Sequence, residues 1–272
     1  MALQLNEQRT HYKDFYGRNI EQMPKLLAEG RIPMSFADFM RKRLEVRNSS
    51  DSSLKGAWID NYFDSGDAMA LDSSGKLKVD LDSKQLKAIN PESKLSNGYL
   101  VLNDELYASI KAKELNPNAK GMIFGKDLTK RQVINHPVWN ALSREDSKLL
   151  KDYSDIVFKD TKKRWKYDKN MGVYLPSKQE TPIVGPWCIY WFVNWSYADG
   201  DIHLDNDDGR FVGVRESAEG ASPQKSYSKK QIREAFRTLQ NKYSQKQILE
   251  ATETVQLKGL EQLFFKNLKK IF

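Results

Sequence analysis

The sequence has very little cysteine and histidine, which excludes several common chemistries. Its one cysteine is Cys188, and its histidines are His11, His136 and His203 in a chain of 272 residues. A single cysteine excludes an intramolecular disulfide framework and any zinc site that needs several cysteines. It also agrees with a reducing compartment, so we expect a cytoplasmic protein.

The sequence also lacks a hydrophobic run long enough to cross a membrane. Its most apolar stretch, residues 183–193, is shorter than the roughly 20 residues that a spanning helix needs, and it contains Gly185 and Pro186. Residues 1–18 mix acidic and basic side chains with few apolar ones, which is not the pattern of a secretory signal. We therefore expect no association with a membrane.

The common catalytic motifs are absent as well. We find no Gly-x-Ser-x-Gly elbow, no phosphate-binding P-loop, no Gly-x-Gly-x-x-Gly turn and no His-Glu-x-x-His motif. Cys188 lies within an apolar stretch, where a thiol is normally inert. His136 precedes Pro137, which is typical of a residue at the start of a helix rather than of a general base. The sequence identifies no reaction and favours a protein that is not an enzyme.

Aromatic residues are plentiful and predict a packed core. The chain has 6 tryptophans, 12 tyrosines and 12 phenylalanines, too many for a disordered protein. Its length suits one large domain with a small appendage. Segments with helical spacing of apolar residues are interspersed with segments that alternate like strands. The combination predicts an α+β fold, an antiparallel or mixed sheet covered by helices, with a helical C-terminal subdomain.

Two helices of the predicted body have clear signals. Ser35 is a typical N-cap residue, and apolar residues at helical spacing follow it. Arg43 and its basic neighbours are predicted to lie on the solvent face of that helix. A second apolar stripe starts after a cap signal at Ser143 and Asp146 and predicts a helix that ends near Trp165.

The strand signals concentrate in the middle of the chain. Residues 76–81 alternate polar and apolar, and a hairpin would pair them with residues 69–71. Asn97 and Gly98 predict a second tight turn. Residues 202–204 and 210–215 flank a turn-rich segment and are interpreted as a closing hairpin.

The positive charge is concentrated at the C-terminal end. Residues 220–272 hold eleven basic and four acidic residues, a net charge of +7, which leaves +1 of the total of +8 for residues 1–219. We therefore predict an α+β body over residues 1–219 and a basic helical subdomain over residues 220–272. Such a surface would attract nucleic acid or an acidic protein. The residues expected to make these contacts are Lys229, Lys230, Arg233, Arg237, Lys242 and Lys246.

An acidic segment provides a weaker, alternative hypothesis of a divalent-metal enzyme. Asp201, His203 and Asp205 alternate along the chain and would share one face of a strand, with oxygen ligands that suit Mg²⁺, Mn²⁺ or Ca²⁺. Asp64 and Asp67 would strengthen the site if the fold brought them close. Turns favour the same residue types, so solvent-exposed turns remain the preferred interpretation.

Tryptophans in the most hydrophobic segment suggest a third function. Trp187, Trp191 and Trp195 recur at even spacing and would lie on one face of a single strand. If that face were exposed, it would form a stacking platform for sugars or bases. Large aromatic residues in an apolar segment are more often part of the core, so both alternatives stay open.

Overall fold

The computed structural model describes residues 3, 5, 11–112, 114–192 and 195–215. The chain divides into two units, residues 1–215 and 216–272. The predicted basic helices and the predicted boundary at residue 219 fall in the second unit, outside the described residues. Within the described part, no helix is long and apolar enough to cross a membrane.

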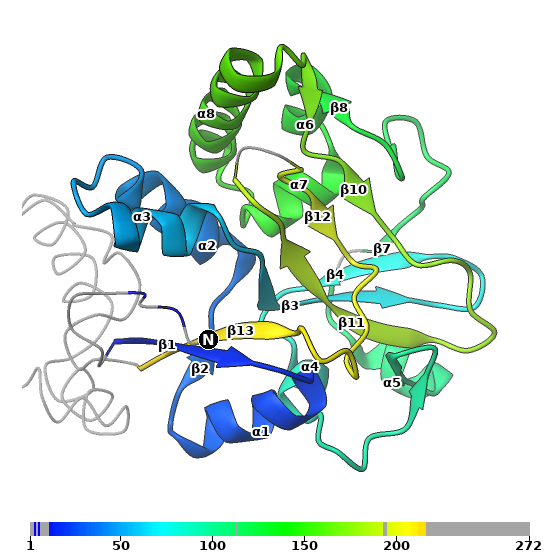
Figure 1. Ribbon diagram of the computed structural model, residues 1–272. Helices are drawn as coiled ribbons and strands as arrows, with labels where there is room; N and C mark the ends of the chain where they lie inside the picture. The colour runs from blue at the N-terminus through cyan, green and yellow to red at the C-terminus, as the bar shows by residue number, and fades with distance from the viewer. Residues whose placement is uncertain (1–2, 4, 6–10, 113, 193–194, 216–272) are drawn as a thin grey trace, which may run out of the picture. The chain divides into compact units, whose positions relative to one another are not determined.

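A mixed but mostly antiparallel sheet runs through the first unit (Figure 1). Its central strand, β3, is bordered by β13 and β11, and pairs parallel with β13 and antiparallel with β11. The strands of this path, in spatial order, are β1 (Tyr12–Tyr16), β13 (Arg210–Val214), β3 (Phe63–Leu71), β11 (Ile183–Ile189), β12 (Ala198–Asp199) and β10 (Val173–Tyr174).

Short strands extend the sheet on either side of this path. β2 (Ile32–Pro33) pairs with β13, β4 (Leu77–Asp80) pairs with β3 and β7 (Glu114–Leu115), and β6 (Tyr99–Val101) pairs with β11 and β5 (Leu95–Ser96). A separate ribbon joins β8 (Leu128–Thr129) to β9 (Lys169–Asn170).

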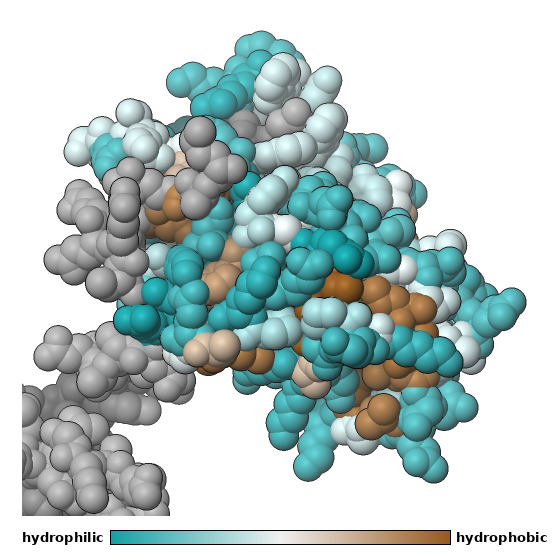
Figure 2. Space-filling model, turned by 60° about the horizontal axis from the view of Figure 1, so that its bottom comes forward, coloured by the Kyte–Doolittle hydropathy of each residue, from teal (hydrophilic) through white to brown (hydrophobic). Residues whose placement is uncertain are grey.

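Helices cover both faces of the sheet and bury two separate cores. The larger core lies beneath α2 (Phe36–Val46), α3 (Ser52–Ile59), α6 (Lys130–Ile134), α7 (Pro137–Leu142) and α8 (Ser147–Trp165). The smaller core lies beneath α1 (Asn19–Ala28), α4 (Lys84–Lys87) and α5 (Asp104–Ser109). These three helices lie on the lower side of Figure 1. Figure 2 turns that side toward the viewer, and its surface is largely hydrophilic, with hydrophobic residues gathered in patches.

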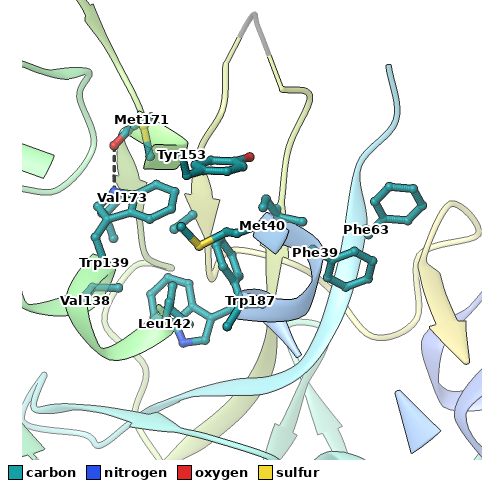
Figure 3. Close-up of a cluster of buried hydrophobic side chains, with 14 of the residues drawn as sticks. Phe39, Met40, Phe63, Val138, Trp139, Leu142, Tyr153, Met171, Val173 and Trp187 are labelled. Carbon is teal, nitrogen blue, oxygen red and sulfur yellow. Dashed lines mark hydrogen bonds between the residues drawn. The ribbon is translucent and has the colours of Figure 1, made fainter. Parts of the chain in front are cut away.

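Tryptophans anchor the larger core (Figure 3). Trp58, Trp139 and Trp187 are fully buried. The indole Nε1 of Trp139 donates a hydrogen bond of 2.9 Å to the carbonyl of Met171, so this ring is buried without losing its polar partner. The α+β architecture predicted from the sequence is confirmed.

Several predicted elements form as expected. The Ser35 side chain accepts a hydrogen bond from the amide of Asp38 at the start of α2. β3 and β4 form the predicted hairpin, and α8 ends at Trp165. Its N-cap is Asp146. His136 caps α7 through its ring, and burial lowers its pKa to about 4, which keeps the ring neutral at physiological pH.

Three expectations are wrong. Arg43 does not face solvent but is fully buried. The aromatic strand ends at Ile189, so Trp187, Trp191 and Trp195 do not share one strand face. Residues 202–204 form no strand, and β13 pairs with β1, β2 and β3 instead of closing a hairpin with them.

Candidate functional site at one end of the central sheet

Three polar side chains lie side by side on one face of the sheet. Cys188 of β11 is in register with Asp64 of β3 on one side and with Asp199 of β12 on the other. Directly opposed residues of neighbouring strands project to the same face. The row faces away from the larger core, because the adjacent residues Phe63, Trp187 and Ile189 belong to that core.

A group of partly exposed aromatic residues surrounds this row, and we call it the tyrosine–tryptophan surface. Its members come from the ends of four neighbouring strands and from the loop between β11 and β12. They are Tyr62, Tyr174, Tyr190, Trp191, Trp195 and Tyr197. Tyr62 and Tyr190 lie two residues from Asp64 and Cys188 respectively, so the two-residue period of a strand directs them to the same face.

The rings form a continuous series of contacts. Tyr174 and Tyr197 have centroids 4.6 Å apart, and Tyr197 lies 6.2 Å from Tyr190. Tyr190 packs edge-on against Trp191 at 5.6 Å, and Trp191 lies 5.7 Å from Trp195. Trp195 ends the series with half of its surface exposed, at 50%.

Asp64 is a buried carboxylate with hydrogen bonds but no ion pair among the described residues. Its Oδ2 accepts hydrogen bonds from Asn19 Nδ2 at 2.9 Å and from the amide of Arg210 at 2.8 Å. Burial raises the pKa of Asp64 to about 6, although these hydrogen bonds act in the opposite direction. The carboxylate is therefore charged at pH 7 at an energetic cost.

Asp199 has a similar environment on the next strand but one. Burial raises its pKa to about 6, and the charges of Asp201 and Asp64 act in the same direction. Its Oδ1 accepts a hydrogen bond of 2.8 Å from the amide of Asp201. Burial and the nearby carboxylates also raise the pKa of the Cys188 thiol, which makes it a poor nucleophile.

The tyrosines above these carboxylates keep their protons. Burial raises the pKa of Tyr190 and of Tyr62 well above the ordinary value, and the charge of Asp64 adds to both shifts. A neutral phenol can donate and accept hydrogen bonds. The site therefore combines planar apolar rings, neutral hydroxyls and ionised carboxylates within a small area.

Arg43 supports the site from the opposite side. Its guanidinium donates to the carbonyls of Asn61 at 2.7 Å and Tyr190 at 2.6 Å. It also binds the carbonyls of Trp58 and Ile189 and the hydroxyl of Tyr153. Through these bonds one side chain joins the end of β11 to the segment that leads into β3, beside two tyrosines of the surface.

A second arginine extends the aromatic surface toward β1. The guanidinium carbon of Arg210 lies 4.7 Å from the ring centre of Tyr16 and 5.5 Å from that of Tyr62, and Nη1 donates to Asn61. The Tyr62 hydroxyl donates a hydrogen bond of 2.6 Å to the carbonyl of Asp208. The acidic turn of residues 205–209 is thereby held at the rim of the site.

The two aspartates that the sequence paired near Ser65 and Gly66 lie on opposite faces of β3. Asp67 faces the larger core, where it accepts hydrogen bonds from the amides of Phe36 and Asp82 and pairs with Arg144 at 2.8 Å. It supports the start of α2 instead of contributing to the site. Of the two, only Asp64 lies near the acidic segment, because Cys188 is in register with both Asp64 and Asp199.

The residues of the metal hypothesis gather around Tyr99 instead of around an ion site. Asp201 accepts a hydrogen bond from the Tyr99 hydroxyl, and the His203 ring packs edge-on against the Tyr99 ring at 5.2 Å. Asp205 lies in the exposed turn. No group of three His, Cys, Asp or Glu side chains in the described ranges is placed to hold a metal ion.

The structure separates the three tryptophans that the sequence placed on one strand face. Trp187 is core, whereas Trp191 is half-buried and Trp195 is exposed. The four tyrosines of the surface were missed, because Tyr62 and Tyr174 are far from the tryptophans along the chain. Their one signal in the sequence is a position next to a strand end.

Comparison with known proteins gives the fold. No family model matches the sequence, and no curated protein matches it. A solved structure described as "Accommodation of massive sequence variation in Nanoarchaeota by the C-type lectin fold" is similar, with a TM-score of 0.56 and 14% identity. The match covers 77% of this chain and 100% of that one. At this identity the likeness is one of fold, and it places the chain among proteins with a C-type lectin fold.

Proposed function

We propose that this protein binds carbohydrate at the tyrosine–tryptophan surface. The observation that carries the proposal is the unbroken series of partly exposed rings from Tyr174 to Trp195, with Asp64 and Asp199 at its base. The apolar faces of sugar rings pack against aromatic side chains, while sugar hydroxyls pair with phenols and carboxylates. The lectin-type fold supports the same function.

Trp195 supports the proposal through its backbone as well as its exposure. Its φ of +58° is a left-handed conformation that a large side chain rarely adopts, and such conformations cost about 1–3 kcal/mol. Backbone strain of this kind clusters at functional sites. A large apolar side chain that is half exposed on a strained residue favours a binding role over a packing role.

Replacing both Trp191 and Trp195 with alanine tests the proposal in the full chain. We expect sugar affinity to fall about tenfold or more, since aromatic packing of this kind is worth about 1–2 kcal/mol. The measurement is a glycan array followed by titration of tryptophan emission with the sugars that bind. The control is Trp165→Ala with Tyr167→Ala, which removes two exposed rings elsewhere and should leave affinity unchanged. Absence of any bound sugar, or equal affinity in the Trp191/Trp195 variant, would contradict the proposal.

A second candidate function is favoured by the charge of the C-terminal segment. Residues 220–272 carry +7 of the net charge of +8. We propose that they contact nucleic acid or an acidic protein, and that the protein is a binding or accessory protein and not an enzyme. Electrostatic attraction of this kind is independent of sequence and weakens strongly with salt.

Charge removal in this segment tests the second candidate. Changing Lys229, Lys230 and Arg233 to glutamine should weaken binding to nucleic acid. It should also reduce the dependence of log K on log salt by about 0.7 to 0.9 for each phosphate that the variant no longer neutralises. The control changes Lys25, Lys84 and Lys94, three exposed lysines of the first unit, in the same way. An equal effect of the two triple variants would refute a special role for the C-terminal segment.

A further inference from the structure

The last turn of α8 and the residues that follow it are exposed along their whole length. Residues 162–169 are all exposed, whereas Thr161 and Asn170 on either side are buried. Trp165 is 49% exposed and Tyr167 is 58% exposed. Neither ring makes an aromatic contact within the described ranges. A single exposed apolar residue is ordinary, but two large rings that lie two residues apart and are both about half exposed favour an interaction site.

The same segment concentrates positive charge. Residues 159–169 hold six basic and two acidic residues, a net charge of +4. Since residues 1–219 carry +1 in total, the remainder of that body carries −3. Both acids are paired, Asp160 with Arg47 at the end of α2 at 2.9 Å and Asp168 with Lys162 of the same segment at 3.1 Å. The other basic side chains face solvent between and beside the two rings.

The segment is an ordered turn that is closed at its base. The amide of Lys166 binds the carbonyl of Lys162, and Lys166 adopts a left-handed conformation with φ of +63° that ends the helix. Asn170 Nδ2 donates a hydrogen bond of 2.7 Å to Thr161 Oγ1, which joins the two ends of the turn. Lys169 then enters β9, which pairs with β8 near the top of Figure 1. The backbone that carries the two rings and the cations is therefore held in a defined turn.

We propose that residues 162–169 bind single-stranded nucleic acid. Bases stack on Trp165 and Tyr167, and the phosphates contact Lys163, Arg164 and Lys166. Aromatic rings interleaved with basic side chains are how proteins hold single strands without reading their sequence, because every base has a flat face and every nucleotide a charge. The proposal uses neither the tyrosine–tryptophan surface nor the C-terminal segment.

A membrane surface is the alternative partner for aromatic and basic residues, and the composition of the turn disfavours it. A helix that lies in a lipid interface needs a continuous apolar face. Apart from Trp165 and Tyr167, every residue from 162 to 169 is charged. The two rings are separated by Lys166, so no apolar face is available for insertion.

Anisotropy of a short fluorescent oligothymidylate with the full chain tests the proposal. Changing Trp165 and Tyr167 to alanine should weaken binding at least about 5-fold, since each stacked base contributes about 1–3 kcal/mol. Changing both to phenylalanine should keep most of the affinity, because a ring remains. The control is Ile32→Ala with Leu106→Ala, which shortens two other large exposed side chains, at 41% and 47% exposure, and should bind as the unchanged chain does.

A charge variant and two competing outcomes complete the test. Lys166→Gly removes one cation and relieves the left-handed backbone, so it should bind more weakly without a lower melting temperature. Changing Lys229, Lys230 and Arg233 to glutamine should lower affinity for the oligonucleotide by the same factor in two backgrounds. These are the unchanged chain and the variant with alanine in place of Trp165 and Tyr167. Unchanged affinity in the alanine variant overturns the proposal. So does binding to phosphatidylserine vesicles that needs Trp165 while the oligonucleotide does not bind.

Discussion

Replacing Arg43 with methionine should destabilise the folded protein by about 3–5 kcal/mol, because each buried acceptor left without a partner costs about 1–3 kcal/mol and some of them will find water. The side chain is fully buried and donates five hydrogen bonds, four of them to backbone carbonyls. Methionine fills similar space but donates nothing, so these carbonyls would lose a partner that water cannot easily replace. The guanidinium itself has no carboxylate partner among the described residues, because the carbonyls solvate it.

Arg47→Met is the control, since it makes the same chemical change at the residue that follows the same helix. Arg47 makes a bidentate pair with Asp160 in which both side chains are partly buried, and because water still reaches it we expect this pair to contribute about 1 kcal/mol. Urea unfolding followed by circular dichroism measures both variants. The network account fails if the two variants lose similar stability. A variant of Arg43 that remains folded should also have Tyr62 and Tyr190 less firmly placed, because Arg43 binds the carbonyls of Asn61 and Tyr190.

Arg43 also explains why part of the fold could not be predicted from the sequence. Its position agrees with the buried stripe, since Phe36, Met40 and Arg43 recur at helical spacing and all are buried. The sequence predicts Arg43 in solvent because charged side chains usually face water, although its spacing indicates the buried side of the helix. The carbonyls that receive it come from residues 58–61 and 189–190, and they meet only when α2 packs against both α3 and β11. Nothing local to α2 carries that information.

Local signals were more reliable where the structure depends on neighbours in the chain. Asn97 and Gly98 both adopt positive φ in the turn between β5 and β6, as an Asn-Gly turn predicts. The left-handed Lys166 closes α8 one residue after its predicted end. The candidate site had no such signal. It depends on the register that brings Asp64 and Asp199 to Cys188, and strand register between segments so far apart is set by the whole fold.

Asp64→Asn should make the protein more stable at pH 7.5 by up to about 3 kcal/mol. The carboxyl has a pKa of about 6 in the folded protein, against an ordinary value of 3.8. A raised pKa means that the folded state binds the proton more tightly than the unfolded state does. The stability of the unchanged protein therefore falls as pH rises from about 4 to about 6, and it stays at the lower level above that range. An asparagine removes the charge and with it this loss.

The geometry allows the substitution with both hydrogen bonds kept. Asn19 and the amide of Arg210 both donate to Oδ2 of Asp64, and a single amide oxygen can accept both bonds. The variant should keep part of the pH dependence, because Asp199 has a similar pKa and remains, and burial also raises the pKa of Asp14, Asp67 and Asp80. Asp72→Asn is a control for which we expect the opposite change in stability. Its hydrogen bonds from Ser74 and Lys76 help to lower the pKa of Asp72, so that variant should be less stable at neutral pH and should lose the deficit in acid.

Urea unfolding at pH 4.5 and pH 7.5 distinguishes these outcomes. An Asp64→Asn protein that gains no stability at pH 7.5, or that has the same pH dependence as the unchanged chain, would show that Asp64 is not a strained buried charge. The expected gain would instead mean that the fold retains, at considerable cost, a carboxylate that its own stability does not need. Residues of that kind concentrate where a protein binds its ligand. Asp64 lies beneath Tyr62 and Tyr190, and its charge acts on both phenols, which are the groups that a bound sugar would contact.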